Sequence, residues 1–128
     1  MEKITKIIQQ KRMLAKGYSE LLHELPGLAT PNEMDWATHI YWLYTILIDE
    51  HVSPLNRDAL VRGLVDNGID ARPVFVPMHK QPIFESDGKF PTAEKISQQG
   101  LTLPSYVNLS EVDQLRVGNT IQALFLAQ

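Results

Sequence analysis

Three polar side chains, those of Arg72, His79 and Gln81, are spaced along a proline-rich segment over residues 68–82. The prolines exclude a regular helix there, because proline fixes φ and has no backbone N–H. A guanidinium can bind a carboxylate or a phosphate through paired donors, and an imidazole can donate to a hydroxyl or transfer a proton near neutral pH. Because a rigid loop that carries polar side chains just past a strand is typical of a functional site, we predict that this segment faces a small ligand.

The same residues also have a purely structural interpretation. Arg72 could form an ion pair with Asp70 or Glu85, as surface arginines commonly do. His79 could be an ordinary histidine of a surface loop. The spacing of these residues does not choose between binding a ligand and pairing within the chain.

The rest of the sequence contains no complete catalytic set, and we predict no catalytic, cofactor-binding or metal-binding residue in this chain. The four histidines are far apart and do not pair with acidic residues at the spacing of a zinc site. No glycine-rich phosphate loop occurs, and Ser105 lacks the flanking glycines of a nucleophile elbow. The lysines, Lys11 among them, are expected on exposed helix faces or in loops, not in the apolar pocket that a Schiff-base lysine needs.

Composition narrows the class of protein further. The chain has 128 residues, enough for one domain, and 44% hydrophobic with 21% charged residues is ordinary for a globular protein. A net charge of −3 without a basic stripe argues against nucleic acid as a partner. No apolar run reaches the roughly 20 residues that cross a bilayer, and the N-terminus has no signal-peptide pattern. Together with the absence of cysteine, these features predict a cytoplasmic protein that does not contact a membrane.

Hydrophobic periodicity predicts short strands between helices. Residues 39–48 are rich in aromatic and β-branched side chains, so we expect a central strand there, with a buried helix as the alternative. Its Trp42 is expected in the core more than in the floor of a ligand pocket. Residues 70–76 are expected to form an edge strand or a strand with irregular ends, because prolines bound them. Residues 26–35 are expected to form a polar loop. The other expected elements are helices over 2–24, 56–68 and 91–99, a strand over 101–103, and a C-terminal helix that Ser110 caps.

These elements predict a single α+β domain over residues 1–128. A layer of helices against a small sheet is the simplest arrangement that buries their apolar stripes. We see no repeat and no linker that would divide the chain.

Five phrases, taken in sequence order, resemble one protein family. They are Lys11-Arg12…Ala15…Tyr18…Leu21-Leu22, Trp42-Leu43-Tyr44, Arg57-Asp58-Ala59-Leu60…Leu64…Gly68-Ile69, Arg72-Pro73-Val74-Phe75…Pro77-Met78-His79…Gln81-Pro82, and Phe90-Pro91-Thr92-Ala93-Glu94-Lys95-Ile96-Ser97…Gly100-Leu101…Leu103-Pro104-Ser105-Tyr106. In order and spacing, the chain resembles the C-terminal small domain of the DegT/DnrJ/EryC1/StrS aminotransferases, which include perosamine synthases.

The resemblance implies a two-layer small domain of the fold-type I, pyridoxal phosphate-dependent class, with a mainly antiparallel sheet. The full-length enzyme would transfer an amino group, usually from glutamate, to a keto sugar on a nucleotide. Pyridoxal phosphate would belong to a large N-terminal domain that this chain lacks, so the chain alone would bind no cofactor and have no transaminase activity. The small domain would close one side of a substrate cleft in a homodimer, with Arg72, His79 and Gln81 at the positions nearest the substrate.

An alternative stays open at this point. The chain could be a stand-alone α+β module that binds a small molecule or another protein without catalysis. In that case the long apolar stripe of the first helix would mark an interface.

Overall fold

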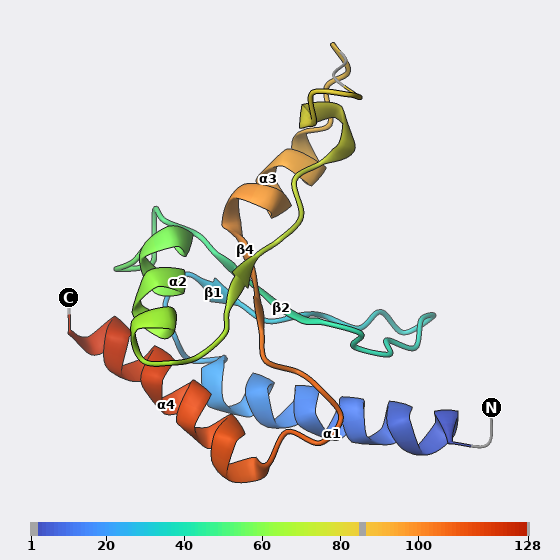
Figure 1. The fold of residues 1–128 in the computed structure, drawn as a ribbon, viewed down its shortest axis with the longest axis vertical. Helices are drawn as coiled ribbons and strands as arrows, with labels where there is room; N and C mark the ends of the chain where they lie inside the picture. The colour runs from blue at the N-terminus through green and yellow to red at the C-terminus, as the bar shows by residue number, and fades with distance from the viewer. Residues whose placement is uncertain (1–2, 85–86, 128) are drawn as a thin grey trace.

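Four short strands form one antiparallel sheet in the order β1-β2-β4-β3 (Figure 1). The computed structural model describes residues 3–84 and 87–127. The strands span Leu28–Ala29 (β1), Tyr44–Ile48 (β2), Arg72–Pro73 (β3) and Gly100–Leu103 (β4). The central pair, β2 and β4, runs in register from Tyr44 opposite Leu103 to Leu47 opposite Gly100. Sheet and helices together confirm the predicted α+β class.

One hydrophobic core lies between the sheet and three helices, α1 (Ile4–Leu22), α2 (Arg57–Asp66) and α4 (Glu111–Leu126). Alternate side chains of β2, from Tyr44 to Ile48, are buried, whereas Thr45 and Leu47 between them are only half-buried. The Tyr18 ring of α1 lies 5.0 Å from the Tyr44 ring, centroid to centroid. Because successive strand residues point to opposite faces, the helices cover one face of the sheet and leave the other open.

Local capping sets the ends of α2 and α4 much as the sequence predicts. The Asn56 side chain accepts a hydrogen bond from the Ala59 amide at 2.8 Å, and the Ser110 hydroxyl accepts one from the Asp113 amide at 3.1 Å. Such side-chain acceptors satisfy amides that have no partner within the helix. Gly68 follows α2 with φ of 72°, the left-handed conformation that glycine adopts freely. The helix itself is shorter than the expected 56–68.

A projecting arm leaves the body of the domain at the β3–β4 edge (Figure 1). It carries a 3₁₀ turn, η1 (Met78–Lys80), and the helix α3 (Pro91–Gln99). Both elements lie wholly within the described residues, and neither contributes a buried side chain. Arg57 of α2 anchors the base of the arm, because its Nη1 donates to the carbonyls of Ser97 at 3.0 Å and Gly100 at 3.2 Å.

The predicted strand over 39–48 is correct only in its second half. Tyr41 has φ of 48°, in the left-handed region, and this interrupts an extended chain before β2 begins. Trp42 is 69% exposed, so its expected place in the core is wrong. The reason is that the preceding segment forms an outlying loop and does not continue the strand.

Two other predictions of strand and loop also change. Of residues 70–76, only Arg72–Pro73 pairs as a strand, although it does lie at the sheet edge as predicted. The expected polar loop over 26–35 contains β1, in which Leu28 pairs opposite Ile48. A two-residue strand has too little sequence pattern to be recognised without its partner.

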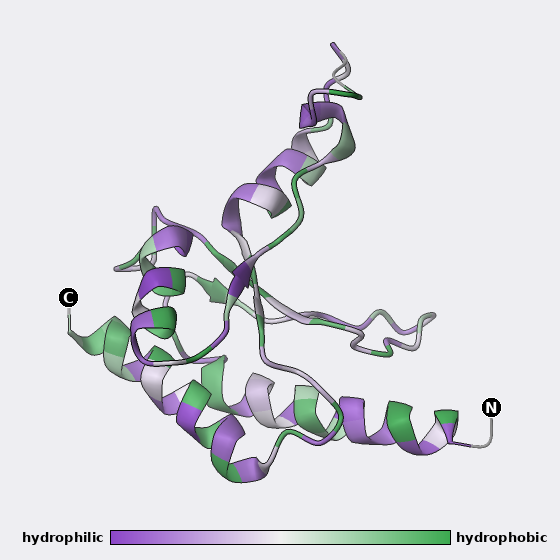
Figure 2. Ribbon diagram, in the orientation of Figure 1, coloured by the Kyte–Doolittle hydropathy of each residue, from purple (hydrophilic) through white to green (hydrophobic). Residues whose placement is uncertain are grey.

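The apolar stripes of the helices are buried only in part. In α4, Val112 is 76% exposed and Leu115 is 42% exposed, whereas Ile121 and Phe125 reach the core as expected. In α1, the buried part of the stripe runs through the second half of the helix, and the apolar residues before Leu14 are not buried. Figure 2 shows hydrophobic residues continuing along these first turns of α1.

Candidate functional site

Two cavities adjoin one another where the loop before β2 approaches the β3–β4 edge. The first has a volume of about 600 Å³ and also reaches α1, and the second has about 550 Å³ and reaches Phe75. Volumes of this size are typical of sites for small molecules. The lining residues that the two cavities share are Ile40, Trp42, Leu43, Arg72 and Thr102.

Arg72, on the edge strand β3, is the cationic residue common to both cavities, and Lys11 also lines the first. The Nε and Nη2 of Arg72 donate to the two carboxylate oxygens of Asp70, each at 3.0 Å. This hydrogen-bonded pair lowers the pKa of the Asp70 carboxyl and raises the pKa of Arg72. Both side chains are more than two-thirds exposed, so the pair is a weak, surface-type interaction. Glu85, the other partner considered for Arg72, lies outside the described residues.

His79 sits in the arm and is engaged by α3. Its Nε2 lies 3.0 Å from Oε1 of Glu94, and its ring centroid lies 4.6 Å from that of Phe90. The hydrogen bond from His79, followed by the nearby charge of Lys80, holds the pKa of Glu94 below its ordinary value. A carboxylate only accepts hydrogen bonds, so Nε2 carries the proton, and in the neutral ring Nδ1 remains as an acceptor. The side chain is 10% exposed, unlike an ordinary surface-loop histidine.

Gln81 turns its amide toward its own loop. Its Nε2 donates to the carbonyl of Val76 at 3.2 Å. Arg72 lines both cavities, whereas neither His79 nor Gln81 is among the described residues that line them. The structure therefore separates the three predicted binding residues into one at the cavities and two in the arm.

Lys11 is the residue that sequence reasoning placed wrongly. It is buried in α1, where we expected an exposed lysine, and burial lowers its pKa. Its Nζ donates to the carbonyl of Trp42 at 2.9 Å and also to the carbonyl of Ser105. Two carbonyl acceptors compensate for removing the ammonium from water. In the sequence, Lys11 interrupts the apolar stripe of the first helix, and this was the signal that could have indicated its burial.

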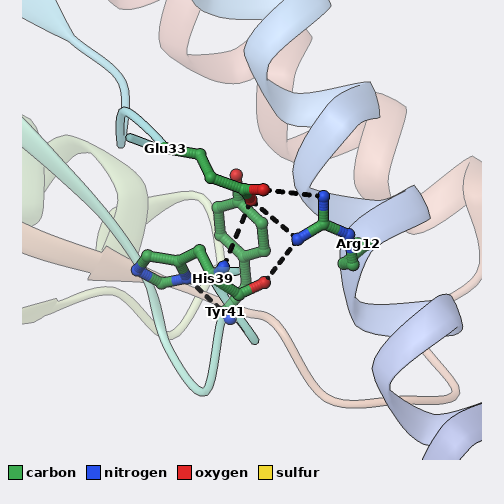
Figure 3. A network of polar contacts seen from close by, with 4 residues as sticks. All are labelled: Arg12, Glu33, His39 and Tyr41. Carbon is green, nitrogen blue, oxygen red and sulfur yellow. Dashed lines mark hydrogen bonds and ion pairs between the residues drawn. The ribbon is translucent and has the colours of Figure 1, made fainter. Parts of the chain in front are cut away.

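A polar network fixes the loop that carries Trp42 (Figure 3). Arg12 of α1 binds the Glu33 carboxylate through both terminal nitrogens, at 2.7 and 3.0 Å, and donates to the His39 carbonyl at 2.8 Å. This bonding lowers the pKa of Glu33. The Tyr41 amide donates to Nδ1 of His39 at 2.8 Å, which requires that nitrogen to be unprotonated. The partners of Arg12 are 21 and 27 residues away, so no local pattern could reveal them.

Across 3–84 and 87–127, no group of three or more histidine or acidic residues is placed to hold a metal ion. In the same ranges, none of the helices combines the length and the apolar character that crossing a bilayer would require.

Comparison with known proteins gives one consistent result. The sequence profile of the DegT/DnrJ/EryC1/StrS aminotransferase family matches residues 1–122. A GDP-perosamine synthase from Vibrio cholerae is 33% identical, over 98% of this chain and 34% of the relative. A pleiotropic regulatory protein from Geobacillus stearothermophilus is also 33% identical, over 91% of this chain and 32% of the relative. The chain thus spans about a third of the length of these curated relatives.

Solved structures agree with the sequence comparison. The aminotransferase TlmJ from Streptoalloteichus hindustanus superposes with a TM-score of 0.87 at 26% identity, over 98% of this chain and 34% of TlmJ. DesV from S. venezuelae, solved in complex with a ketimine intermediate, has a TM-score of 0.80 at 27% identity, over 91% of this chain and 31% of DesV. In both cases nearly all of this fold corresponds to one part of a longer chain.

Proposed function

Because this chain belongs to the DegT/DnrJ/EryC1/StrS aminotransferase family, we propose that it is the C-terminal small domain of a nucleotide-sugar aminotransferase. It would form one wall of a cleft in which an amino group, from glutamate, is transferred to a keto sugar. The observation that carries the proposal is the match of almost the entire chain to about a third of each relative, among them a GDP-perosamine synthase and a dTDP-dehydro-sugar 4-aminotransferase.

The described residues of this chain do not fit pyridoxal phosphate as their own cofactor. A Schiff-base lysine must present a free amine in an apolar pocket, and within residues 3–84 and 87–127 Lys11 is the only buried lysine. Its ammonium is already bonded to two carbonyl oxygens. We therefore propose that another part of the full-length enzyme would hold the cofactor, which supplies the electron sink for amino transfer, and we assign no step of the chemistry to this chain.

Arg72 is the residue that we propose for recognition of an anionic part of the substrate. Arg72 lines both cavities, and among the described residues its guanidinium is paired with the exposed Asp70. A phosphate or carboxylate can replace the Asp70 carboxylate on the same two donors, because an exposed pair of this kind is weak.

His79 and Gln81 are proposed as further contacts with the substrate. The hydrogen bonds that they already form within the chain limit which of their atoms can bind it. Glu94 holds Nε2 of His79, and Val76 accepts from the Gln81 amide nitrogen. The groups left to a substrate hydroxyl are therefore Nδ1 of His79, an acceptor, and the amide oxygen and second N–H of Gln81. The full-length enzyme would be a homodimer, with the cleft at its interface.

A second candidate function is a stand-alone module without catalysis. The apolar, aromatic rim of the two cavities favours it, since two exposed rings, Trp42 at 69% and Phe75 at 69%, would suit a flat ligand or a protein surface. The first proposal accounts for the same surface by placing the rest of the enzyme against it.

A chimeric enzyme tests the proposed function. In the Vibrio cholerae GDP-perosamine synthase, this chain would replace the matching third. We expect the chimera to bind pyridoxal phosphate and to aminate the sugar nucleotide, and Arg72→Gln to raise KM more than it lowers kcat. A folded, cofactor-loaded chimera without transaminase activity would contradict the proposal and favour the stand-alone module.

A further inference from the structure

The N-terminal half of α1 has an apolar stripe that the described part of the domain does not cover. Ile4 is 52% exposed and Ile7 is 37% exposed, and Ile8 is only half-buried. Figure 1 shows these turns extending past α4, and Figure 2 shows their hydrophobic residues. A helix in a globular protein is stabilised mainly by packing its apolar face. The stripe therefore marks a face that has no partner among the residues that the structure describes.

The loop before β2 supplies a second wall of the same face. Ile40 is 54% exposed and Trp42 is 69% exposed, and both line the cavity of about 600 Å³ together with the isoleucines of α1. This wall is held in place, because Lys11 binds the Trp42 carbonyl and Arg12 binds the loop through Glu33. A preformed surface loses little conformational entropy on binding.

The charges at this face are already compensated. The Lys11 ammonium at its floor has two carbonyl acceptors. The Arg12 guanidinium at its edge has the Glu33 carboxylate. An apolar partner can therefore cover the face without burying an unpaired charge, which would otherwise oppose binding strongly.

The position of the matched part within the relatives identifies what covers this face. The chain corresponds to the C-terminal third of these enzymes. The rest of such an enzyme would join at the start of α1, next to Ile4. We propose that the docking face, formed by Ile4, Ile7, Ile8, Ile40 and Trp42, binds the cofactor-holding large domain of the enzyme. This proposal rests on the proposed function and adds to it the surface through which the two domains are joined.

Binding in trans tests the docking face. The part of the Vibrio cholerae GDP-perosamine synthase that precedes the matched third would carry an affinity tag and be co-expressed with the untagged 128-residue chain. We expect the chain to be retained at one copy per tagged segment. Ile4→Asp and Trp42→Ser should each reduce the retained amount about tenfold or more, as for residues central to an interface.

Matched variants at other exposed positions are the controls. Val112→Asp lies in the first turn of α4 as Ile4→Asp lies in the first turn of α1, and Trp36→Ser removes an indole that lines neither cavity. An acidic residue in the first turn suits the helix dipole in both helices, so both aspartate variants should fold, as circular dichroism would verify. The controls should be retained like the unmodified chain.

Three results would overturn the docking face. They are no retention of the unmodified chain, equal losses in the controls, and light scattering that shows a dimer of this chain which Trp42→Ser dissociates. The last result would assign the face to a second copy. If the chimera is active but one of these three results is found, the proposed function stands and the docking face is wrong. If the chain is retained as expected but the folded chimera is inactive, the docking face stands and the proposed function is wrong.

Discussion

The Nζ of Lys11 lies 2.9 Å from the carbonyl oxygen of Trp42, so a lysine in the middle of α1 holds the residue that leads into β2. The same ammonium reaches the carbonyl of Ser105, just after β4. Because β2 and β4 are paired, these bonds close the open end of the central ladder. Pro104 has no N–H to continue that ladder, and the Ser105 hydroxyl accepts from the Tyr44 amide at 3.2 Å in its place.

Replacing Lys11 should therefore destabilise the domain. In Lys11→Met the side chain keeps its length and apolar contacts, but two carbonyls lose their donor. We expect the free energy of unfolding to fall by about 1–3 kcal/mol, the usual cost of leaving buried polar groups unpaired. Urea denaturation would measure it. Lys16→Met, on the exposed face of the same helix, is the control and should change stability little. Equal unfolding curves for Lys11→Met and the unmodified chain would disprove the role of this bond.

Loss of the Arg12 network should loosen one loop without unfolding the domain. Arg12→Gln removes the paired bonds to Glu33 and the bond to the His39 carbonyl. Because both side chains are about one-third exposed, the global free energy of unfolding should change little. Hydrogen exchange at residues 33–41 should rise about tenfold through local opening. Lys16→Gln, which breaks an exposed pair with Glu20 in α1, should leave that loop unchanged.

The arm should lose order in acid through Glu94. The hydrogen bond from His79 lowers the pKa of Glu94, so the folded arm binds this proton more weakly than the unfolded arm does. The stabilisation from ionised Glu94 is therefore fully present at pH values above 4.5, the ordinary pKa of this carboxyl. It is lost as the pH falls below 4.5 and passes through the lowered pKa of the folded arm. Chemical shifts of α3 between pH 6 and pH 3 would show the loss. Glu94→Gln should abolish this pH dependence, and Glu111→Gln in α4 should retain it. A pH response that survives in Glu94→Gln would assign it to another group.

Tyr44 should make the domain sensitive to alkali. Its hydroxyl pairs with that of Ser19 at 2.8 Å, and burial raises the pKa of Tyr44 to about 12. The folded state keeps this proton where the unfolded state, with a pKa near 10, releases it. The free energy of unfolding should therefore fall as pH rises from about 10 to 12, by up to about 1.4 kcal/mol per pH unit.

The variant Tyr44→Phe isolates this contribution. At pH 8 it should be less stable by about 1 kcal/mol, because the bond to Ser19 is lost. Between pH 8 and pH 11 its stability should fall less steeply than that of the unmodified chain. Tyr106→Phe, at a ring that is 59% exposed, is the control. Parallel curves for Tyr44→Phe and the unmodified chain would exclude Tyr44 as the responsible group.

Local signals in the sequence predicted local features correctly. Asn56 and Ser110 cap their helices, and Gly68 takes the left-handed conformation. The second half of the α1 stripe is buried, and the proline-bounded strand lies at the sheet edge. Each of these depends on neighbours within a few residues along the chain, and such neighbours are present in the sequence pattern itself.

Long-range contacts decided the rest, and the sequence carries no local record of them. Trp42 is exposed because Tyr41 bends the chain and Arg12, 27 residues before His39, fixes the loop. Lys11 can be buried because its ammonium donates to the carbonyl of Ser105, which is 94 residues away. The separation of Arg72 from His79 at the two cavities likewise required the folded chain, whereas the pairing of Arg72 with Asp70 was one of the alternatives that the sequence offered.

The sequence alone determined that this is an α+β domain of an aminotransferase family, where most helices end, and which residues are apolar. Only the tertiary structure showed which apolar residues the domain covers and which it leaves for a partner. The physical reason is that periodicity reports the polarity of a helix face, whereas burial depends on what packs against that face. For the first turns of α1, the described residues of this chain do not supply that partner.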